Sequence, residues 1–162
     1  LKVDISKFFD KTYTLEQGYV EGGDILRINN HFIIGISGRT NETGAKNLSN
    51  IIEKNGGTSE IAITPENTLH FKSECSLLDE ETILATDNLI KSDFFNKKYR
   101  IIKVPKGEET GANCLRINEH LLIPKGYDRL LDLVSKDYKV RVLDVTEMEK
   151  VDAGLSCLSL RW

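Results

Sequence analysis

Several features that mark specialised proteins are scarce in this chain of 162 residues. Its 3 Pro and 12 Gly exclude collagen-like and low-complexity sequences. Its 3 cysteines are odd in number, far apart and without a Cys-x-x-Cys pair, which excludes a disulfide scaffold and a zinc ribbon. The longest apolar run, Phe32–Ile36, contains a glycine and is far shorter than the roughly 18 residues that cross a membrane. No secretory signal is visible, so we expect a reducing, cytoplasmic setting without a membrane partner.

Charge of one sign is also missing. The chain has 22 Lys plus Arg against 25 Asp plus Glu, which gives a net charge of −3. A protein that binds nucleic acid through charge is usually clearly basic, so no nucleic-acid partner is expected. Hydrophobic residues make up 40% of the chain, which is enough for a sizeable core. The chain begins at Leu1 and its one methionine is Met148, so we expect a processed chain or a fragment.

What the sequence does contain is a repeat. The first unit is predicted to have strands at Ile25–Ile28 and His31–Ile36, joined by a tight turn at Asn29-Asn30. A helix with Ala45, Leu48, Ile51 and Ile52 on one face follows, capped at Asn41 or Thr43 and ended by Asn55-Gly56-Gly57. A strand at Glu60–Ile63 completes this ββαβ unit.

The same order of elements returns twice. The second unit is predicted at Cys75–Leu78, Thr82–Ala85, helix Leu89–Phe95 and strand Arg100–Val104. The third is predicted at Cys114–Ile117, His120–Ile123, helix Tyr127–Lys136 and strand Lys139–Leu143. Partial units flank them: Ile5–Phe9 as the tail of a helix, Tyr19-Val20 as a strand, and Leu155–Leu160 as an opening strand. Because an open ring leaves unpaired strand edges, half a unit at each end predicts a ring whose remaining blades precede Leu1.

Three polar residues stand at matching places, just before or within an opening strand. They are Glu21, His70 and Cys157. Equivalent positions in a pseudo-symmetric ring face a common axis, so we expect the three side chains to meet in a central pocket. A cysteine is a strong nucleophile only as thiolate, which a nearby His or a cation favours. A carboxylate can orient the His or hold a cationic substrate.

Each residue also has a structural interpretation. A cysteine in an apolar strand is more often a small buried hydrophobe, and a lone His beside Leu69 and Phe71 is more often structural. Glu21, which precedes two glycines, can be a solvated turn residue. Arg39 either binds a carboxylate or is a surface arginine. Cys75 and Cys114 are expected to be structural.

Five ordered motifs, which run from near residue 15 to the C-terminus, resemble the dimethylarginine dimethylaminohydrolase family. They are Val20-Glu21-Gly22-Gly23-Asp24, Gly38-Arg39-Thr40-Asn41 with Gly44-Ala45, Leu69-His70-Phe71-Lys72-Ser73, Gly111-Ala112-Asn113-Cys114 and Lys150–Leu160. The resemblance implies a pseudo-fivefold α/β propeller of ββαβ units, of which this chain holds about three full units plus partial ones. It implies that residues 1–162 are a single catalytic domain, the C-terminal portion of the propeller.

The resemblance also implies an activity and assigns the roles. The expected reaction is hydrolysis of Nω-methylated arginines to citrulline and a methylamine, with a small-molecule substrate, no metal and no cofactor. Cys157 is the implied nucleophile, and His70 the implied acid and base. Glu21 is implied to bind guanidinium nitrogens and position His70. Arg39 and the carbonyl of Val151 are implied to bind the amino-acid end of the substrate, and the family leaves room for a homodimer.

Neighbouring families remain alternatives. Arginine deiminases have an Asp two residues after the matching His, where this chain has Lys72, and their nucleophile follows a different motif. A deiminase or amidinotransferase on the same scaffold, or a propeller that only binds proteins, is therefore the competing hypothesis. The family's upstream portion supplies further acidic residues and a lid loop that this chain lacks. We therefore expect these 162 residues to be inactive in isolation.

Overall fold

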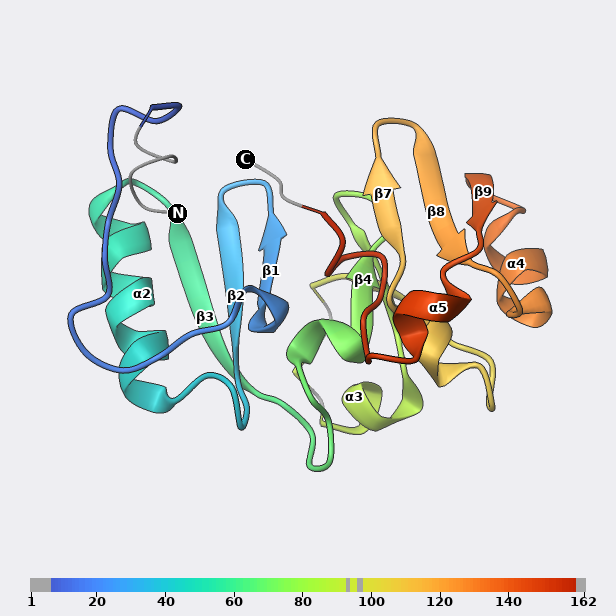
Figure 1. The fold of residues 1–162 in the computed structure, drawn as a ribbon, viewed down its shortest axis with the longest axis horizontal. Helices are drawn as coiled ribbons and strands as arrows, with labels where there is room; N and C mark the ends of the chain where they lie inside the picture. Colours follow the sequence, from blue (N-terminus) through green and yellow to red (C-terminus); the bar gives the residue numbers. More distant parts are fainter. Residues whose placement is uncertain (1–6, 93, 96–97, 160–162) are drawn as a thin grey trace.

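The computed structural model describes residues 7–92, 94–95 and 98–159. They form three small sheets of three strands each, with the helices on the outer sides (Figure 1). In every sheet the first two strands are antiparallel and the second pairs in parallel with the third, which follows a helical crossover. This is the predicted ββαβ unit, repeated three times.

The elements of the first unit are η1 (Gly22–Asp24), β1 (Ile25–Ile28), β2 (His31–Ile36), α2 (Glu42–Lys54) and β3 (Thr58–Ile63). Those of the second are η2 (Phe71–Ser73), β4 (Cys75–Leu77), β5 (Thr82–Ala85), α3 (Asp87–Lys91) and β6 (Arg100–Lys103). Those of the third are η3 (Glu109–Ala112), β7 (Leu115–Ile117), β8 (His120–Pro124), α4 (Asp128–Val134) and β9 (Lys139–Leu143). The short helix α5 (Thr146–Glu149) leads into the C-terminal segment.

Local chemistry explains where these elements turn and end. Asn29 and Asn118 adopt positive φ in the first and third hairpins, a conformation that asparagine tolerates. The side chain of Asn41 accepts a hydrogen bond from Gly44 N and caps α2. Gly56, at φ +83°, ends the same helix in the left-handed region.

The apolar core lies between successive units. Leu26, Ile33 and Ala62 of the first unit pack against Phe71 and Ile83 of the second. The second unit packs in the same way, through Leu84 and Val104, on Leu121, Ile123 and Leu130 of the third. Each unit therefore covers one face of the next, as blades of a propeller do.

The flanking predictions were wrong wherever the structure describes them. Residues 155–158 form a turn and residue 159 is irregular, so neither belongs to a strand, and Leu160 lies outside the described residues. Tyr19-Val20 is not a strand, because the Tyr19 backbone bonds with Asn41 at the start of α2 instead. Of the predicted helix tail Ile5–Phe9, residues 7–9 are not helical and the rest lies outside the described residues.

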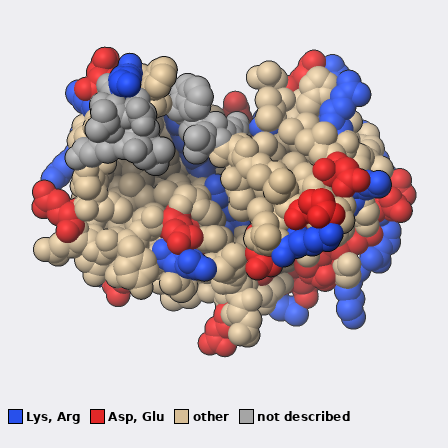
Figure 2. All heavy atoms as spheres, viewed as in Figure 1, with Lys and Arg blue, Asp and Glu red and all other residues tan. Residues whose placement is uncertain are grey.

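No helix in the described ranges has the length and apolar character needed to cross a membrane. On the face drawn in Figure 2, acidic and basic side chains are interspersed without a large area of one sign. This distribution agrees with the balanced charge of the sequence.

Candidate active site

Each opening strand is preceded by a short 3-10 turn, and these turns lie together. Turn η1 contacts η2, and η2 contacts η3. The residue that precedes η1 is Glu21 and the residue that precedes η2 is His70, so two of the predicted site residues occupy the same place in successive units. The repeat thereby brings together two side chains that are 49 positions apart in sequence.

Glu21 and His70 are in direct contact. Glu21 Oε2 lies 2.7 Å from His70 Nε2. An ionised carboxylate only accepts hydrogen bonds, so Nε2 carries the proton and donates, which leaves Nδ1 as the second nitrogen. The His70 hydrogen bond holds the pKa of Glu21 below its ordinary value of 4.5, and the charge of Arg39 lowers it further. The carboxylate is therefore ionised at neutral pH.

Arg39 lies on the other side of the same carboxylate. Its Nη1 is 3.5 Å from Glu21 Oε1, and more than half of its side chain is exposed. The loop that carries it is closed by hydrogen bonds from Ser37 N to Thr40 O and from Arg39 N to Ser37 Oγ. The structure thus brings three of the five predicted residues, Glu21, His70 and Arg39, into one chain of contacts.

Sequence reasoning missed the residue that holds this arrangement in place. Asp24 is completely buried and accepts hydrogen bonds from Ser37 Oγ, Thr40 Oγ1 and the backbone N–H of Phe71. Those bonds satisfy a buried carboxylate and fix the backbone next to His70. The signal was present in the Glu-Gly-Gly-Asp motif, but nothing local distinguishes this Asp from a solvated one.

Gly23, which precedes Asp24, leaves the space that the His70 imidazole occupies. A Cβ built on Gly23 would lie 2.5 Å from His70 Cγ, whereas one built on Gly22 would meet nothing within 4 Å. Since real Cβ atoms do not approach that closely, the ring packs directly on the Gly23 backbone.

Cys157 lies in the turn formed by residues 155–158 and is exposed. Its thiol makes no hydrogen bond to His70 or Glu21 within the described part of the chain. The other cysteines differ, because Cys75 and Cys114 are buried and burial raises the pKa of both thiols, that of Cys114 to about 12. The interpretation of Cys157 as a small core hydrophobe is therefore wrong, and among the three cysteines it alone is accessible.

The turn before Cys157 is held from two sides. Asp152 adopts φ +57°, and Ala153 N donates to Met148 O in α5. Leu155 is buried against Leu115 and Val145 of the third unit. Val151, the remaining predicted substrate contact, is mostly exposed in this turn.

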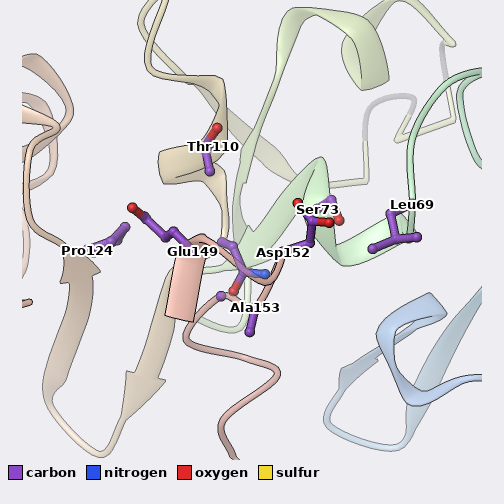
Figure 3. Close-up of a pocket in the computed structure, with 9 residues that line it drawn as sticks. Leu69, Ser73, Thr110, Pro124, Glu149, Asp152 and Ala153 are labelled. Atoms are coloured by element: carbon purple, nitrogen blue, oxygen red, sulfur yellow. The ribbon is translucent and has the colours of Figure 1, made fainter. Parts of the chain in front are cut away.

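A pocket of about 310 Å³ is lined in part by the segments that carry His70 and Cys157. The lining includes Leu69 and Ser73 from the segment around His70, and Asp152, Ala153 and Gly154 from the segment before Cys157. Of these, Figure 3 labels Leu69, Ser73, Asp152 and Ala153. The remaining lining residues are Thr110, Asn113, Pro124 and Glu149. The lining includes near neighbours of His70 and Cys157, but not these two residues themselves.

The described residues contain no group of three or more His, Cys, Asp or Glu side chains arranged to hold a metal ion. The groups that the arrangement offers for chemistry are a carboxylate–imidazole pair and an accessible thiol.

Comparison with solved structures finds the same α/β fold in an amidinotransferase. The superposition on inosamine-phosphate amidinotransferase from Streptomyces griseus has a TM-score of 0.71 at 19% identity and covers 91% of this chain and 47% of that one. At that identity, the likeness concerns the fold alone.

Closer relatives define the family. The model of the family "Arginine deiminase" matches residues 2–122. The dimethylarginine dimethylaminohydrolase of Pseudomonas aeruginosa is 36% identical over 146 residues, which cover 90% of this chain and 57% of that protein. The Streptomyces coelicolor enzyme of the same name is 30% identical over 151 residues, which cover 90% of this chain and 55% of that protein. The chain therefore belongs to the arginine deiminase family and, within it, to the dimethylarginine dimethylaminohydrolase branch.

A solved structure supports the same assignment. The Pseudomonas aeruginosa enzyme, crystallised as a cysteine-to-serine variant with citrulline, superposes with a TM-score of 0.93 at 34% identity over 99% of this chain and 64% of that one. The chain thus spans somewhat more than half the length of the curated relatives that it matches.

Proposed function

We propose that the protein hydrolyses Nω-methylated arginines to citrulline and methylamine or dimethylamine. The observation that carries this proposal is the 2.7 Å contact between Glu21 and His70, in a chain with one accessible cysteine. The similarity to enzymes that carry this name supports the choice of substrate.

In the first half of the reaction, the Cys157 thiolate attacks the guanidinium carbon and forms a C–S bond. The C–N bond to the methylated nitrogen then breaks, and His70 protonates the departing amine, which leaves a covalent thiouronium. Because Nε2 of His70 is held by Glu21, Nδ1 is the atom that transfers the proton. General acid–base assistance of this kind contributes about 10²–10⁴ in rate.

In the second half, neutral His70 removes a proton from water, whose oxygen attacks the same carbon. The second water proton is lost to solvent, the C–S bond breaks, the carbon keeps the oxygen as the ureido carbonyl of citrulline, and the thiolate is restored. Glu21 stays ionised throughout, because its pKa is lowered by His70 and Arg39. It can therefore stabilise the imidazolium and attract the cationic guanidinium.

The amino-acid end of the substrate is assigned to Arg39 and Val151. Arg39 has an exposed guanidinium that can pair with a carboxylate in a bidentate manner. Val151 is exposed on the turn that leads to Cys157, so its carbonyl can accept a hydrogen bond from the substrate amine. No step calls for a metal or an organic cofactor.

The test is citrulline formation by the protein as its gene encodes it, with dimethylarginine, monomethylarginine and arginine offered separately. Cys157→Ser is expected to abolish citrulline release. Cys114→Ala removes a buried thiol and is expected to retain activity, which makes it the matched control. Failure of the unaltered protein to form citrulline from any of the three substrates would refute the proposal.

A second candidate is arginine deimination, which is favoured by the family model that matches residues 2–122. It differs from the first in the leaving group, because arginine releases ammonia whereas methylated arginines release methylamines. A kcat/KM for arginine that exceeds the value for dimethylarginine would select the deiminase.

A further inference from the structure

Asn113 makes a hydrogen bond across the molecule to the turn that carries Cys157. Its Oδ1 accepts the backbone N–H of Ser156 at 2.9 Å, although the two residues are 43 positions apart. Ser156 directly precedes Cys157, so this side-chain bond holds the Leu155–Ser156 peptide, one residue before the exposed thiol.

The same asparagine also packs against the turn. A Cβ built on Gly154 would lie 2.5 Å from Asn113 Cγ and 2.6 Å from Nδ2. A side chain at position 154 would therefore displace Asn113, and the absence of one lets the amide pack closely on the backbone. The glycine and the asparagine together set where residues 154–157 run.

A similar side-chain bond fixes the backbone beside His70. Asp24, at the end of η1, accepts the backbone N–H of Phe71, which adjoins His70. Asn113, at the end of η3, accepts the backbone N–H of the residue that adjoins Cys157. In both cases a side-chain oxygen from one unit fixes the backbone beside a reacting group carried by the next segment.

We infer that Asn113 is a positioning residue for the nucleophile, acting through Ser156 N to hold the Cys157 thiol in its attacking direction. The inference rests on the proposed hydrolase and extends it to a residue that touches neither substrate nor thiol. A displacement of about 1 Å at a reacting atom can cost about 100-fold in rate.

The experiment compares Asn113→Leu, which has similar size without an acceptor, with Asn113→Asp, which keeps the acceptor. Asn47→Leu is the matched control, because Asn47 also bonds a distant backbone group, Gln17 O, but from helix α2. The readouts are kcat and KM for citrulline release, amide hydrogen exchange in residues 154–158, and the pH midpoint of Cys157 alkylation by iodoacetamide.

Asn113→Leu is expected to lower kcat about 100-fold, to change KM by less than about threefold and to speed exchange in residues 154–158. At high pH, the kcat of Asn113→Asp is expected to be at least about tenfold higher than that of Asn113→Leu. The alkylation midpoint of Asn113→Asp should move upward, because a nearby carboxylate disfavours the thiolate. Asn47→Leu should leave all three readouts unchanged.

The inference is overturned if Asn113→Leu keeps the unaltered kcat, if its exchange in residues 154–158 does not change, or if Asn47→Leu lowers kcat equally. Exchange and alkylation need no substrate. If the unaltered protein forms no citrulline, the proposed function fails, while these two readouts still decide whether Asn113 controls the turn.

Discussion

The turns η2 and η3 begin with residues at the same place in the repeat, yet those residues have different environments. His70 precedes η2 and contacts Glu21, its counterpart before η1. Glu108 precedes η3 and turns instead to helix α4, where it accepts the backbone N–H groups of Arg129 and Leu130. The repeat therefore supplies the position, whereas the neighbouring groups decide whether a side chain there can take part in chemistry or only stabilises a helix start.

The electrostatics of the two carboxylates sharpen the contrast. Glu21 is exposed and its pKa is lowered by the imidazole and then by Arg39. For Glu108 burial raises the pKa, but hydrogen bonds from Leu130 N and Arg129 outweigh it and the net pKa lies below its usual value. The Glu21 carboxylate thus faces solvent beside His70, whereas the Glu108 carboxylate bonds with groups of the fold itself.

The largest expected effect is on the activity of a His70 variant. His70→Ala removes the proposed acid and base and should lower kcat/KM for citrulline release by about 10²–10⁴. The melting temperature should change little, because the lost bond to Glu21 is partly exposed. Glu108→Ala, at the equivalent position, is expected to keep its activity per folded molecule. Equal losses in the two variants would contradict the contrast drawn here.

A smaller loss is expected when a methyl group is placed under the imidazole. Gly23→Ala puts a Cβ 2.5 Å from His70 Cγ, so the ring must shift from the position in which it contacts Glu21. We expect kcat to fall about 100-fold. Gly22→Ala has free space around its new methyl group and should stay within about threefold of the unaltered enzyme. Steady-state kinetics of the two variants decide between crowding at His70 and a general effect of replacing glycine.

The smallest effect concerns stability. Glu108→Ala leaves the buried N–H of Leu130 without its acceptor and should reduce the free energy of unfolding by about 1–3 kcal/mol at pH 7, measured in urea. Because the folded-state pKa is depressed, this stabilisation is present above the ordinary value of 4.5 and is lost as pH falls through the folded value.

The difference in stability between the unaltered protein and Glu108→Ala should therefore shrink in acid. Glu119→Ala is the control, since its ion pair with Lys139 is largely exposed and contributes about 0–1 kcal/mol. A difference that stayed unchanged down to the lowest pH at which the protein remains folded would argue that Glu108 acts through packing rather than through its charge.

The sequence predicted the strands because their signals are local. Alternating apolar residues and asparagine turns placed all nine strands to within about two residues, and the capping Asn41 was one of two candidates. The 3-10 turns and α5 were missed, since segments of three or four residues have no period to detect. The predicted strand at Leu155–Leu160 was wrong for a related reason. Alternation of apolar residues permits a strand but does not supply a partner strand, and residues 155–159 pair with none of the described strands.

The site was predictable only in part. Matching positions in the repeat indicated that Glu21 and His70 belong together, and the structure places them in contact. Asp24 and Asn113 were not assigned roles, because their importance comes from backbone partners 47 and 43 positions away. Such partners depend on how the units stack, which no local pattern reveals.

The polar bond at each junction also has a consequence for protein engineering. Asp24 joins the first unit to the second, the Ser76 hydroxyl joins the second to the third through Cys114, and Asn113 joins the third to the C-terminal segment. Each connection spans only adjacent modules. We therefore expect that a whole module can be exchanged with that of a distant homologue only if the donor and acceptor at its two borders are kept together with the apolar faces that pack there.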